Sequence, residues 1–424
     1  MKKILLFGAG KSATVLISYL INEATNCNWT ITIADVDREL ILLKTDYSPV
    51  CEAIGMDITN DEKRGKLIEQ ASIVISMMPP ALHFLIAKDC VEYGKNLLTA
   101  SYLDSAVKSL ETEINNKQLL FICEMGLDPG IDHMSAMKIM DEIKAKGGKI
   151  SSFKSHCGGL VAPESDDNPL HYKVSWNPRN IVLAGKTGAE YKINNEIIQK
   201  KYADLFSKCN QVNIDGAGNF ATYPNRDSLS YLPIYKLEDI PTFIRTTLRH
   251  PNFCKAWEAI VKSDLTNDTI ILNTNELSYV KWSAATHPFI NQENKGALLF
   301  LGLFDDTLVP TNAKTSADIM QFIVETKLVM KSTDKDMIVM LHEISYQILE
   351  KETNIESSLI VIGENNLYTA MAKTVGLPLG IAAKLILNST IQLTGLHIPT
   401  VKEIYDPVLK ELANYGIAFN EHQV

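Results

Sequence analysis

Six residues near the N-terminus have the types and spacing needed to bind a phosphate group through the backbone. Gly8-Ala9-Gly10-Lys11-Ser12-Ala13 follows a short apolar run and precedes a segment with helical periodicity. Gly8 permits a tight turn, Gly10 lets backbone amides approach a pyrophosphate, and Ala13 lets the helix pack closely on the strand. A GxGxxA pattern in this strand–turn–helix setting predicts a dinucleotide site.

Asp35, at the end of the second predicted strand, is placed to select the dinucleotide. A carboxylate there accepts hydrogen bonds from the adenosine ribose diol and repels a 2′-phosphate. The next residue, Val36, is uncharged, and Asp37 offsets the charge of the nearby Arg38. We therefore expect NAD as the cofactor, with NADP as the alternative.

The first 125 residues must form the scaffold for these groups, because apolar strands and amphipathic helices alternate along them. Short, almost wholly apolar strands are typical of a parallel sheet covered by helices on both faces. Six of them predict an α/β fold with a doubly wound Rossmann sheet. They are expected at residues 2–8, 29–35, a segment ending at 56–58, 72–80, 96–102 and 119–125.

Three loops of unusual composition follow predicted strands and should meet at one edge of the sheet. They contain Pro79-Pro80, Ala100-Ser101-Tyr102 and GLDPG, residues 126–130. Ligands of open α/β sheets bind at the carboxyl ends of the strands. We therefore expect the GLDPG turn to face the nicotinamide half of the cofactor and to end the cofactor domain.

After about residue 130 the alternation stops, which predicts a second domain of different construction. Residues 149–160 form a predicted strand that ends in a glycine pair. Residues 180–200 have the pattern of short antiparallel strands. The stretch from 237 to about 330 has a mostly helical pattern. DMIVMLHEISYQI and SSLIVIGE predict paired antiparallel strands. TAMAKTVGLPLGIAAKLILNS predicts a helix pair, interrupted at residues 376–378, that packs back on the first domain.

Arginine is rare in this chain, with six arginines against 35 lysines, and four of the six fall in the second domain. They are Arg179, Arg226, Arg245 and Arg249, the last two lying four residues apart. A planar guanidinium pairs with a carboxylate through two contacts, which lysine cannot do. The group therefore predicts a clamp for a carboxylate-bearing substrate.

Several other kinds of chemistry find no support. HExxH, GxSxG and P-loop motifs are absent from the sequence. His156 and Cys157 are adjacent on a predicted strand, so they should point to opposite faces and cannot pair. His133 follows Asp132 in the opening turn of a predicted helix, where a structural role is the simpler interpretation.

Composition narrows the partners and the compartment. The net charge of −9, without a basic block, argues against nucleic acid or an anionic membrane as the main partner. The apolar run before Gly8 is too short for a signal peptide, and no stretch approaches about 20 apolar residues. Seven scattered cysteines without metal-like spacing indicate reduced thiols, a cytoplasmic location and no metal site.

Long irregular motifs resemble one family from the GAGKSA turn to KEIYDPVL near residue 408. They are GLDPGIDHM, HCGGLVAPESDDNPLHYKVSW, YPNRDS, RTTLRH, KDMIVML and TAMAKTVGLP. The family is the glutamate-forming saccharopine dehydrogenases, also called saccharopine reductases. The resemblance is weakest over residues 255–330.

The resemblance implies an enzyme that oxidises the secondary amine of saccharopine with a nicotinamide cofactor and water. The products are glutamate and 2-aminoadipate 6-semialdehyde, which belong to lysine metabolism. It also implies a homodimer and a dinucleotide domain at 1–127. An α/β substrate and dimerisation domain is expected at 128–250 and about 331–365, a helical subdomain at about 251–330, and returning C-terminal helices at about 366–424.

The matched motifs imply specific contacts. Substrate contacts are Ser101, Tyr102, Asp128, Arg226, Thr247, Leu248 and Arg249. Cofactor contacts are Gly8, Gly10, Lys11, Ser12, Ala13, Asp35, Asp57, Ile58, Met78, Ala100, Ser101, Leu127, Asp128, Pro129 and Ser175. Asp128, Tyr102 and Cys157 are the candidates for proton transfer.

The family divides by cofactor. Fungal biosynthetic members carry arginine after the second strand and use NADP, whereas the dehydrogenase half of the animal lysine-degrading enzyme carries an acid and uses NAD. IADVDRE resembles the second group. Two alternatives stay open: an enzyme similar to carboxynorspermidine dehydrogenase, and a catalytically silent NAD-binding regulator. The retained Arg226, Arg249, Tyr102 and Asp128 count against the regulator.

Overall fold

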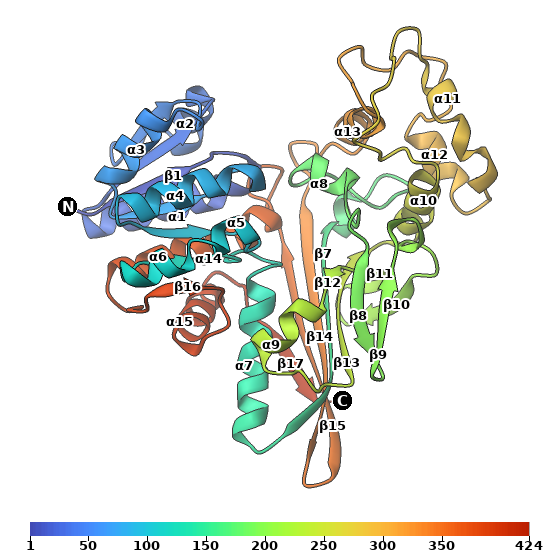
Figure 1. Cartoon of the computed structure of the whole chain (residues 1–424). Helices are drawn as coiled ribbons and strands as arrows, with labels where there is room; N and C mark the ends of the chain where they lie inside the picture. Colours follow the sequence, from blue (N-terminus) through green and yellow to red (C-terminus); the bar gives the residue numbers. More distant parts are fainter. Residues whose placement is uncertain (424) are drawn as a thin grey trace. The chain divides into compact units, whose positions relative to one another are not determined.

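The computed structural model describes residues 1–423 (Figure 1). The chain forms two compact units, and both are discontinuous in sequence. Unit 1 contains Met1–Glu142 and Leu367–Ala418. Unit 2 contains Ile143–Asn366 and the chain from Phe419 onward.

Unit 1 is built on a seven-stranded parallel sheet with the order β16-β6-β5-β4-β1-β2-β3. This confirms the doubly wound Rossmann fold and its six predicted strands. The seventh strand was missed because it has three residues and follows a turn-rich segment. The strands are β1 Lys3–Phe7, β2 Thr30–Asp35, β3 Cys51–Gly55, β4 Ile73–Ser76, β5 Asn96–Thr99, β6 Leu120–Ile122 and β16 Gly395–His397.

Side-chain caps fix where several helices of unit 1 begin. Asp37, Asn60 and Asp104 each accept a hydrogen bond from a backbone amide of the first turn that follows. The predicted helix over 104–117 is divided into α5 and α6. The helices are η1 Lys11–Ala13, α1 Thr14–Cys27, α2 Arg38–Thr45, α3 Asp61–Gln70, η2 Pro80–Leu82, α4 His83–Glu92, α5 Ser105–Lys108, α6 Glu111–Asn116, α7 Ile131–Ala145, α14 Ala370–Leu387 and α15 Lys402–Ala413.

The predicted helix pair near the C-terminus is wrong, because α14 is one continuous helix with Pro378 inside it. A proline removes one backbone hydrogen bond, and burial of both halves outweighs that loss. The small residues pack against α1: a Cβ at Gly376 would lie 2.9 Å from the Leu16 nitrogen. By length and composition α14 could cross a membrane, but 72% of it is buried, as in a core helix.

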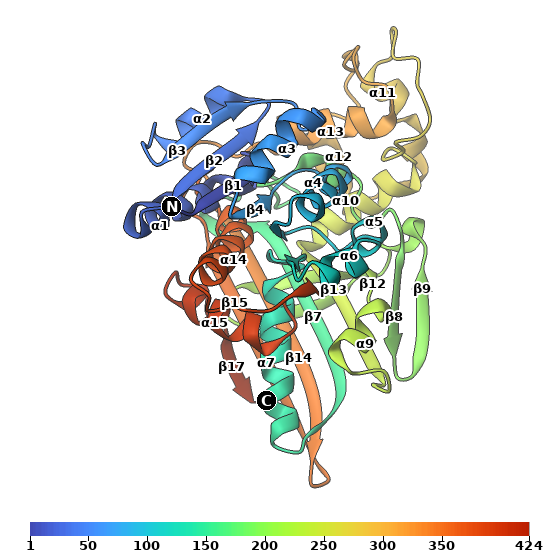
Figure 2. The same ribbon diagram turned by 60° about the vertical axis from the view of Figure 1, so that its left-hand side comes forward.

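Unit 2 is built on a long mixed sheet with the order β10-β11-β13-β7-β14-β15-β17, to which β8, β9 and β12 are added. Figure 2 shows the long strands β7 and β14, which pair antiparallel, side by side. The predicted antiparallel pairing of the strands around residues 336–362 is confirmed. The strands are β7 Lys149–Val161, β8 Ala189–Ile193, β9 Glu196–Lys200, β10 Asn210–Ile214, β11 Gly218–Pro224, β12 Arg226–Asp227, β13 Thr242–Arg249, β14 Asp336–Ile348, β15 Lys351–Ile362 and β17 Asn420–Gln423.

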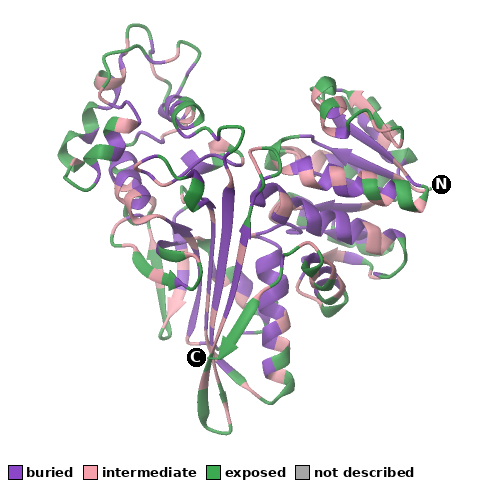
Figure 3. Cartoon of the chain, turned by 180° about the vertical axis from the view of Figure 1, so that it is seen from behind, coloured by how far each residue is buried: buried purple, intermediate pink, exposed green. Residues whose placement is uncertain are grey.

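The helical pattern predicted from residue 237 begins too early, because β13 occupies 242–249. Its sequence TFIRTTLR is rich in β-branched and aromatic residues, and these favour a strand with two packed faces. Figure 3 shows that the long central strands of unit 2 are largely buried. Helices follow from residue 251 and pack around Trp257. The helices of unit 2 are η3 Pro163–Ser165, α8 Pro178–Val182, η4 Tyr202–Asp204, η5 Leu229–Tyr231, α9 Leu232–Tyr235, α10 Pro251–Lys262, α11 Tyr279–Trp282, η6 Ala284–Phe289, α12 Lys295–Phe300 and α13 Ser316–Lys327.

Candidate active site

The glycine turn after β1 has the geometry of a phosphate-binding loop. Gly8 has φ +98°, and a Cβ there would lie 3.0 Å from the Met77 carbonyl group. A Cβ at Gly10 would meet nothing within 4 Å. Open space therefore lies beside Gly10 at the start of η1 and α1, where backbone amides and the helix dipole favour an anion. The turn fits a dinucleotide pyrophosphate.

Asp35 is joined directly to this turn. Its Oδ2 accepts a hydrogen bond of 2.7 Å from the Ala9 amide, and its Oδ1 one of 3.1 Å from the Asp37 amide. Val36 is 75% exposed. The guanidinium of Arg38 donates to the Ala53 carbonyl at 3.3 Å and pairs with a neighbouring glutamate. The Asp35 carboxylate is thus fixed beside the glycine turn.

Lys44 is a residue at this turn that sequence reasoning missed. Its Nζ donates to the Gly10 carbonyl at 2.6 Å and to the Thr14 hydroxyl at 2.9 Å. Burial lowers the pKa of Lys44 to about 8, while the charge of Asp35 acts in the opposite direction. The sequence offered no signal, because this residue is one of 35 lysines and lies 34 positions from Gly10.

A buried arginine sets the position of the Asp57-Ile58 segment. Arg64 donates to the Ile58 carbonyl at 2.7 Å and to Asp89 at 2.7 Å. Asp57 accepts hydrogen bonds from both the amide and the hydroxyl of Thr59, at 2.8 Å each. These two bonds hold the pKa of the Asp57 carboxyl below its usual value. Arg64 was also missed by sequence reasoning.

The loops after β5 and β6 lie against each other. The Met125 amide donates to the Thr99 carbonyl at 3.0 Å, and a Cβ at Gly126 would be 3.0 Å from the Cβ of Ala100. The GLDPG turn closes on itself, since a Cβ at Gly130 would be 2.1 Å from the Gly126 oxygen. Both glycines are therefore required. The Asp128–Pro129 peptide bond in this turn is cis.

Unit 1 therefore carries most of the predicted cofactor contacts, and they follow the carboxyl ends of its strands. They are Gly8, Gly10, Lys11, Ser12, Ala13, Asp35, Asp57, Ile58, Met78, Ala100, Ser101, Leu127, Asp128 and Pro129. Tyr102, a predicted substrate contact, also belongs to unit 1. The remaining predicted cofactor contact, Ser175, belongs to unit 2 and is buried there.

In unit 2, one face of the sheet carries two of the predicted substrate contacts, Thr247 and Arg249. Cys157 on β7 and Tyr223 on β11 are both register partners of Thr247 on β13. Partners in register point to the same face, and Arg249 lies two residues further along that face. Burial raises the pKa of Tyr223 to about 12, so its hydroxyl stays protonated.

The opposite face of the same strands is structural. His156 bonds to the Thr246 hydroxyl at 2.7 Å and to Glu343 at 2.8 Å. This confirms that His156 and Cys157 point to opposite faces. The side chain of Leu248 is fully buried on the His156 side, in the core cluster with Leu160. Only the backbone of Leu248 faces the predicted contacts.

Arg249 is a buried cation without an acid. It is 4% exposed, and its guanidinium lies 5.0 Å from the Tyr172 ring and 5.6 Å from the Phe253 ring. One nitrogen, Nη1, donates to the Leu248 carbonyl at 2.8 Å, but Nε has no hydrogen-bond partner. Across residues 1–423 no carboxylate pairs with it. A buried charge is costly unless it is paired, so this group is suited to a carboxylate of a ligand.

The other three arginines of the predicted clamp differ from one another. Arg226 lies exposed on β12 and has φ +52°. It also interacts with another group of the protein. Arg245 is buried, with its guanidinium 4.5 Å from the Tyr231 ring. Arg179 pairs with Asp318 at 2.8 Å. Arg179 therefore has a partner within the protein, so the prediction that all four arginines form the clamp is wrong for Arg179.

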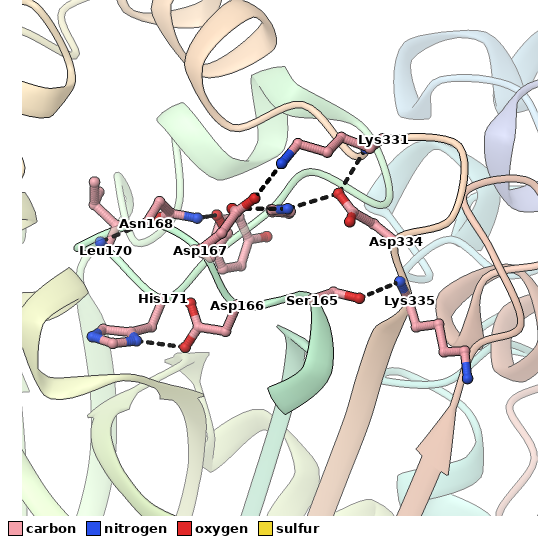
Figure 4. A network of polar contacts seen from close by, with 11 residues as sticks. Ser165, Asp166, Asp167, Asn168, Leu170, His171, Lys331, Asp334 and Lys335 are labelled. Atoms are coloured by element: carbon pink, nitrogen blue, oxygen red, sulfur yellow. Dashed lines mark hydrogen bonds and ion pairs between the residues drawn. The ribbon is translucent and has the colours of Figure 1, made fainter.

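The segment before Tyr172 is held by a polar network (Figure 4). Lys173 is 4% exposed and pairs with Asp334 at 2.7 Å and Asp167 at 2.9 Å. Lys331 also pairs with Asp167, at 2.6 Å. Hydrogen bonds from Lys173 and Lys331 lower the pKa of Asp167 to about 2. The network fixes the segment that carries the ring packed on Arg249.

Two family models match this chain over almost its whole length. The saccharopine dehydrogenase NADP binding domain matches residues 4–122, and the saccharopine dehydrogenase C-terminal domain matches 126–417. The chain belongs to the saccharopine dehydrogenase family.

Individual members of the saccharopine dehydrogenase family match along the full chain. Saccharopine dehydrogenase [NADP(+), L-glutamate-forming] from Saccharomyces cerevisiae is 32% identical, over 100% of this chain and 99% of that protein. Mitochondrial alpha-aminoadipic semialdehyde synthase from Mus musculus is 33% identical, over 99% of this chain and 47% of that protein. The chain thus spans about half the length of that synthase.

A solved structure of the family has the same fold. The apo saccharopine dehydrogenase (L-Glu forming) from Saccharomyces cerevisiae matches with a TM-score of 0.89 and 30% identity, covering 100% of both chains. The family membership and the glycine turn together indicate a nicotinamide dinucleotide cofactor.

Proposed function

We propose that this chain oxidises the secondary amine of L-saccharopine, giving L-glutamate and 2-aminoadipate 6-semialdehyde. The observation that carries the proposal is the buried, acid-free guanidinium of Arg249 on the same sheet face as Cys157 and Thr247. The full-length match to an L-glutamate-forming enzyme supports the same substrate. Neither of the two alternatives from the sequence has an observation in its favour.

Arg249 and Arg226 would bind substrate carboxylates, of which saccharopine has three. A hydrogen bond to a charged group contributes about 1.5–3 kcal/mol. Thr247 and Tyr223 place two hydroxyl groups beside Arg249 on the same face. The unit 2 residues would therefore orient the substrate by its acids, which leaves its amine for chemistry.

The bound dinucleotide supplies the acceptor for a hydride from the carbon beside the amine. This chain's own residues have to move protons, because the amine must lose one before oxidation and water must then add to the imine. Asp128 would accept the proton of the amine, and Tyr102 would hydrogen-bond the amine or the attacking water. Cys157 is 6% exposed and would serve as a weak acid or as a small packing contact.

For the cofactor, the proposal is NAD in preference to NADP. The support is Asp35, whose carboxylate stands at the ribose end of the turn with the uncharged Val36 after it. The names of the yeast relative and of the matched family model point instead to NADP. Lys44 is the one cation bonded to the turn in the described chain, and it donates hydrogen bonds to the Gly10 carbonyl and the Thr14 hydroxyl.

The decisive test is turnover of purified protein with L-saccharopine and either NAD or NADP. Formation of the reduced nicotinamide with saccharopine would support the proposal, and glutamate should appear in equal amount. If neither cofactor is reduced, the proposed activity is wrong. Reduction with carboxynorspermidine but not with saccharopine would favour the first alternative.

We also propose a homodimer in the cytoplasm. The seven cysteines are free thiols in the structure, which suits a reducing compartment. Light scattering on the purified protein would measure the mass in solution. A monomer at all concentrations would contradict the dimer.

A further inference from the structure

Glu124 is a strained and buried acid just after β6. Its φ is +57°, a conformation that non-glycine residues seldom adopt, and its exposed fraction is 4%. The surrounding structure must compensate for both the strain and the burial of a carboxylate. The contacts of Glu124 must therefore stabilise this strained and buried conformation.

The contacts of Glu124 enclose Tyr102. The Glu124 amide donates to the Ser101 carbonyl at 2.9 Å, and its Oε1 accepts from the Leu103 amide at 3.0 Å. Both neighbours of Tyr102 are therefore bonded to one residue. The loop from 101 to 103 has no helix or strand of its own to fix it.

The second oxygen of Glu124 leads to the GLDPG turn. Oε2 is 2.9 Å from Nε2 of His133, a fully buried residue in the first turn of α7. Next to it, Asp132 accepts a hydrogen bond of 2.6 Å from the Gly130 amide, and its own amide donates to the Leu127 carbonyl at 3.1 Å. Asp132 thus binds the turn on both sides of Asp128. His133 and Asp132 are consecutive on one helix, so the two loops share one support.

We propose that Glu124 is a positioning residue that holds Tyr102 for the reaction, anchored through His133 to the helix whose Asp132 binds the Asp128 turn. The inference rests on the proposed function for the roles of Tyr102 and Asp128. It adds residues outside the predicted contacts, and it replaces the interpretation of His133 as a lone structural histidine. Glu124 acts through Tyr102, and Asp132 acts through the turn.

A double-mutant cycle tests this action. Glu124→Met keeps a similar shape but removes both acceptors, and should lower kcat by about 10- to 100-fold, the scale expected for a misplaced catalytic group. In a Tyr102→Phe background, the same change should lower kcat by no more than about twofold, because its target has already lost its hydroxyl. Glu124→Gln retains an acceptor for the Leu103 amide and should recover most of the lost activity.

Stability and cofactor affinity provide the controls. All variants are compared at a temperature where circular dichroism shows them folded, with the exposed Glu69→Gln as the matched substitution. The Kd for the dinucleotide should change less than kcat. Equal losses from Glu124→Met in both backgrounds would overturn the proposal, since the effect would then not pass through Tyr102.

Hydrogen exchange of the unsubstituted protein gives a test that needs neither activity nor a folded variant. The Leu103 amide should exchange slowly although it lies in an irregular loop, because Glu124 binds it. Exchange as fast as that of an exposed amide would overturn the inference. Saccharopine turnover is measured separately. If the protein does not oxidise saccharopine but its Leu103 amide exchanges slowly, the proposed function is refuted and the Glu124 contact is not.

Discussion

The backbone amide of Ala9 donates a 2.7 Å hydrogen bond to Oδ2 of Asp35, which ties the glycine turn to the end of β2. One residue therefore shapes the turn and, in the proposed binding mode, would present its charge to the ribose. A ribose diol must share this carboxylate with the turn. A 2′-phosphate would meet the same negative charge.

The first prediction concerns cofactor preference. NAD should be favoured over NADP by at least about tenfold in kcat/KM, equivalent to about 1.4 kcal/mol. Changing Asp35→Ser together with Val36→Arg should shift the preference towards NADP, because it removes the repulsion and adds a phosphate-binding guanidinium. Steady-state kinetics with both cofactors provides the measurement. Equal efficiencies in the unsubstituted enzyme would show that Asp35 does not discriminate.

The second prediction concerns the carboxylate contacts. Arg249→Met and Arg226→Met should each raise KM for saccharopine by about thirtyfold, the equivalent of about 2 kcal/mol. The Kd for the dinucleotide should stay nearly constant. Arg179→Met is the matched control, since Arg179 pairs with Asp318 and should leave KM unchanged. An unchanged KM in Arg249→Met would make that arginine structural.

The third prediction separates stability from binding at Arg249. Because Nε of this buried guanidinium has no partner, its removal should not destabilise the fold and should raise the free energy of unfolding by about 1–3 kcal/mol. Urea unfolding without ligand would measure this change. A less stable Arg249→Met would mean that packing on Tyr172 and Phe253 outweighs the desolvation of the charge.

The fourth prediction concerns proton transfer. Asp128→Ala should lower kcat by about 10²–10⁴-fold, the usual contribution of a general acid or base. Tyr102→Phe should lose less activity, and Cys157→Ser least. The pH profile of kcat/KM should lose its acidic limb in Asp128→Ala. If that variant keeps both its rate and its limb, Asp128 is only part of the turn.

The fifth prediction is a pH dependence of stability from His83. This side chain bonds to the Ser76 hydroxyl at 2.8 Å, and burial lowers its pKa from 6.5 to about 4. Its contribution is complete above the unfolded pKa, and it is lost as the pH falls from 6.5 through the folded pKa. The full loss is about 3 kcal/mol.

Urea unfolding at a series of pH values between these limits would measure the slope. His83→Asn stays uncharged and should flatten the pH dependence, whereas His287→Asn, at an exposed site, should not. An equal slope in His83→Asn and in the unsubstituted protein would assign the acid sensitivity to other groups.

Sequence predicted those parts of the molecule that local patterns determine. The glycine turn, Asp35 and the six main strands of unit 1 were predicted because their signals lie within a few adjacent residues. The segment of β13 was assigned to a helical stretch because the four-residue spacing of Arg245 and Arg249 is compatible with the periodicity of a helix and with that of a strand. On a strand, as on a helix, residues i and i+4 share a face.

The residues that sequence reasoning missed act across long separations. Lys44 reaches Gly10 over 34 positions, and Lys173 reaches Asp334 over 161. Glu124 is significant only because β5 and β6 are neighbours in the sheet. A single sequence states which residues are present but not which of them meet, so lysines and acids of ordinary appearance carry no signal.

The return of Leu367–Ala418 to unit 1 has a consequence for synthesis of the chain. During translation, the strands β1 to β6 leave the ribosome long before α14, which covers α1, and before β16, which pairs with β6. Until then the face of α1 around Leu16 and Tyr19 has no partner. Unit 1 cannot complete its fold until more than 200 residues of unit 2 have been synthesised. During that interval the apolar face of α1 is uncovered, and exposed apolar surface favours aggregation of a nascent chain.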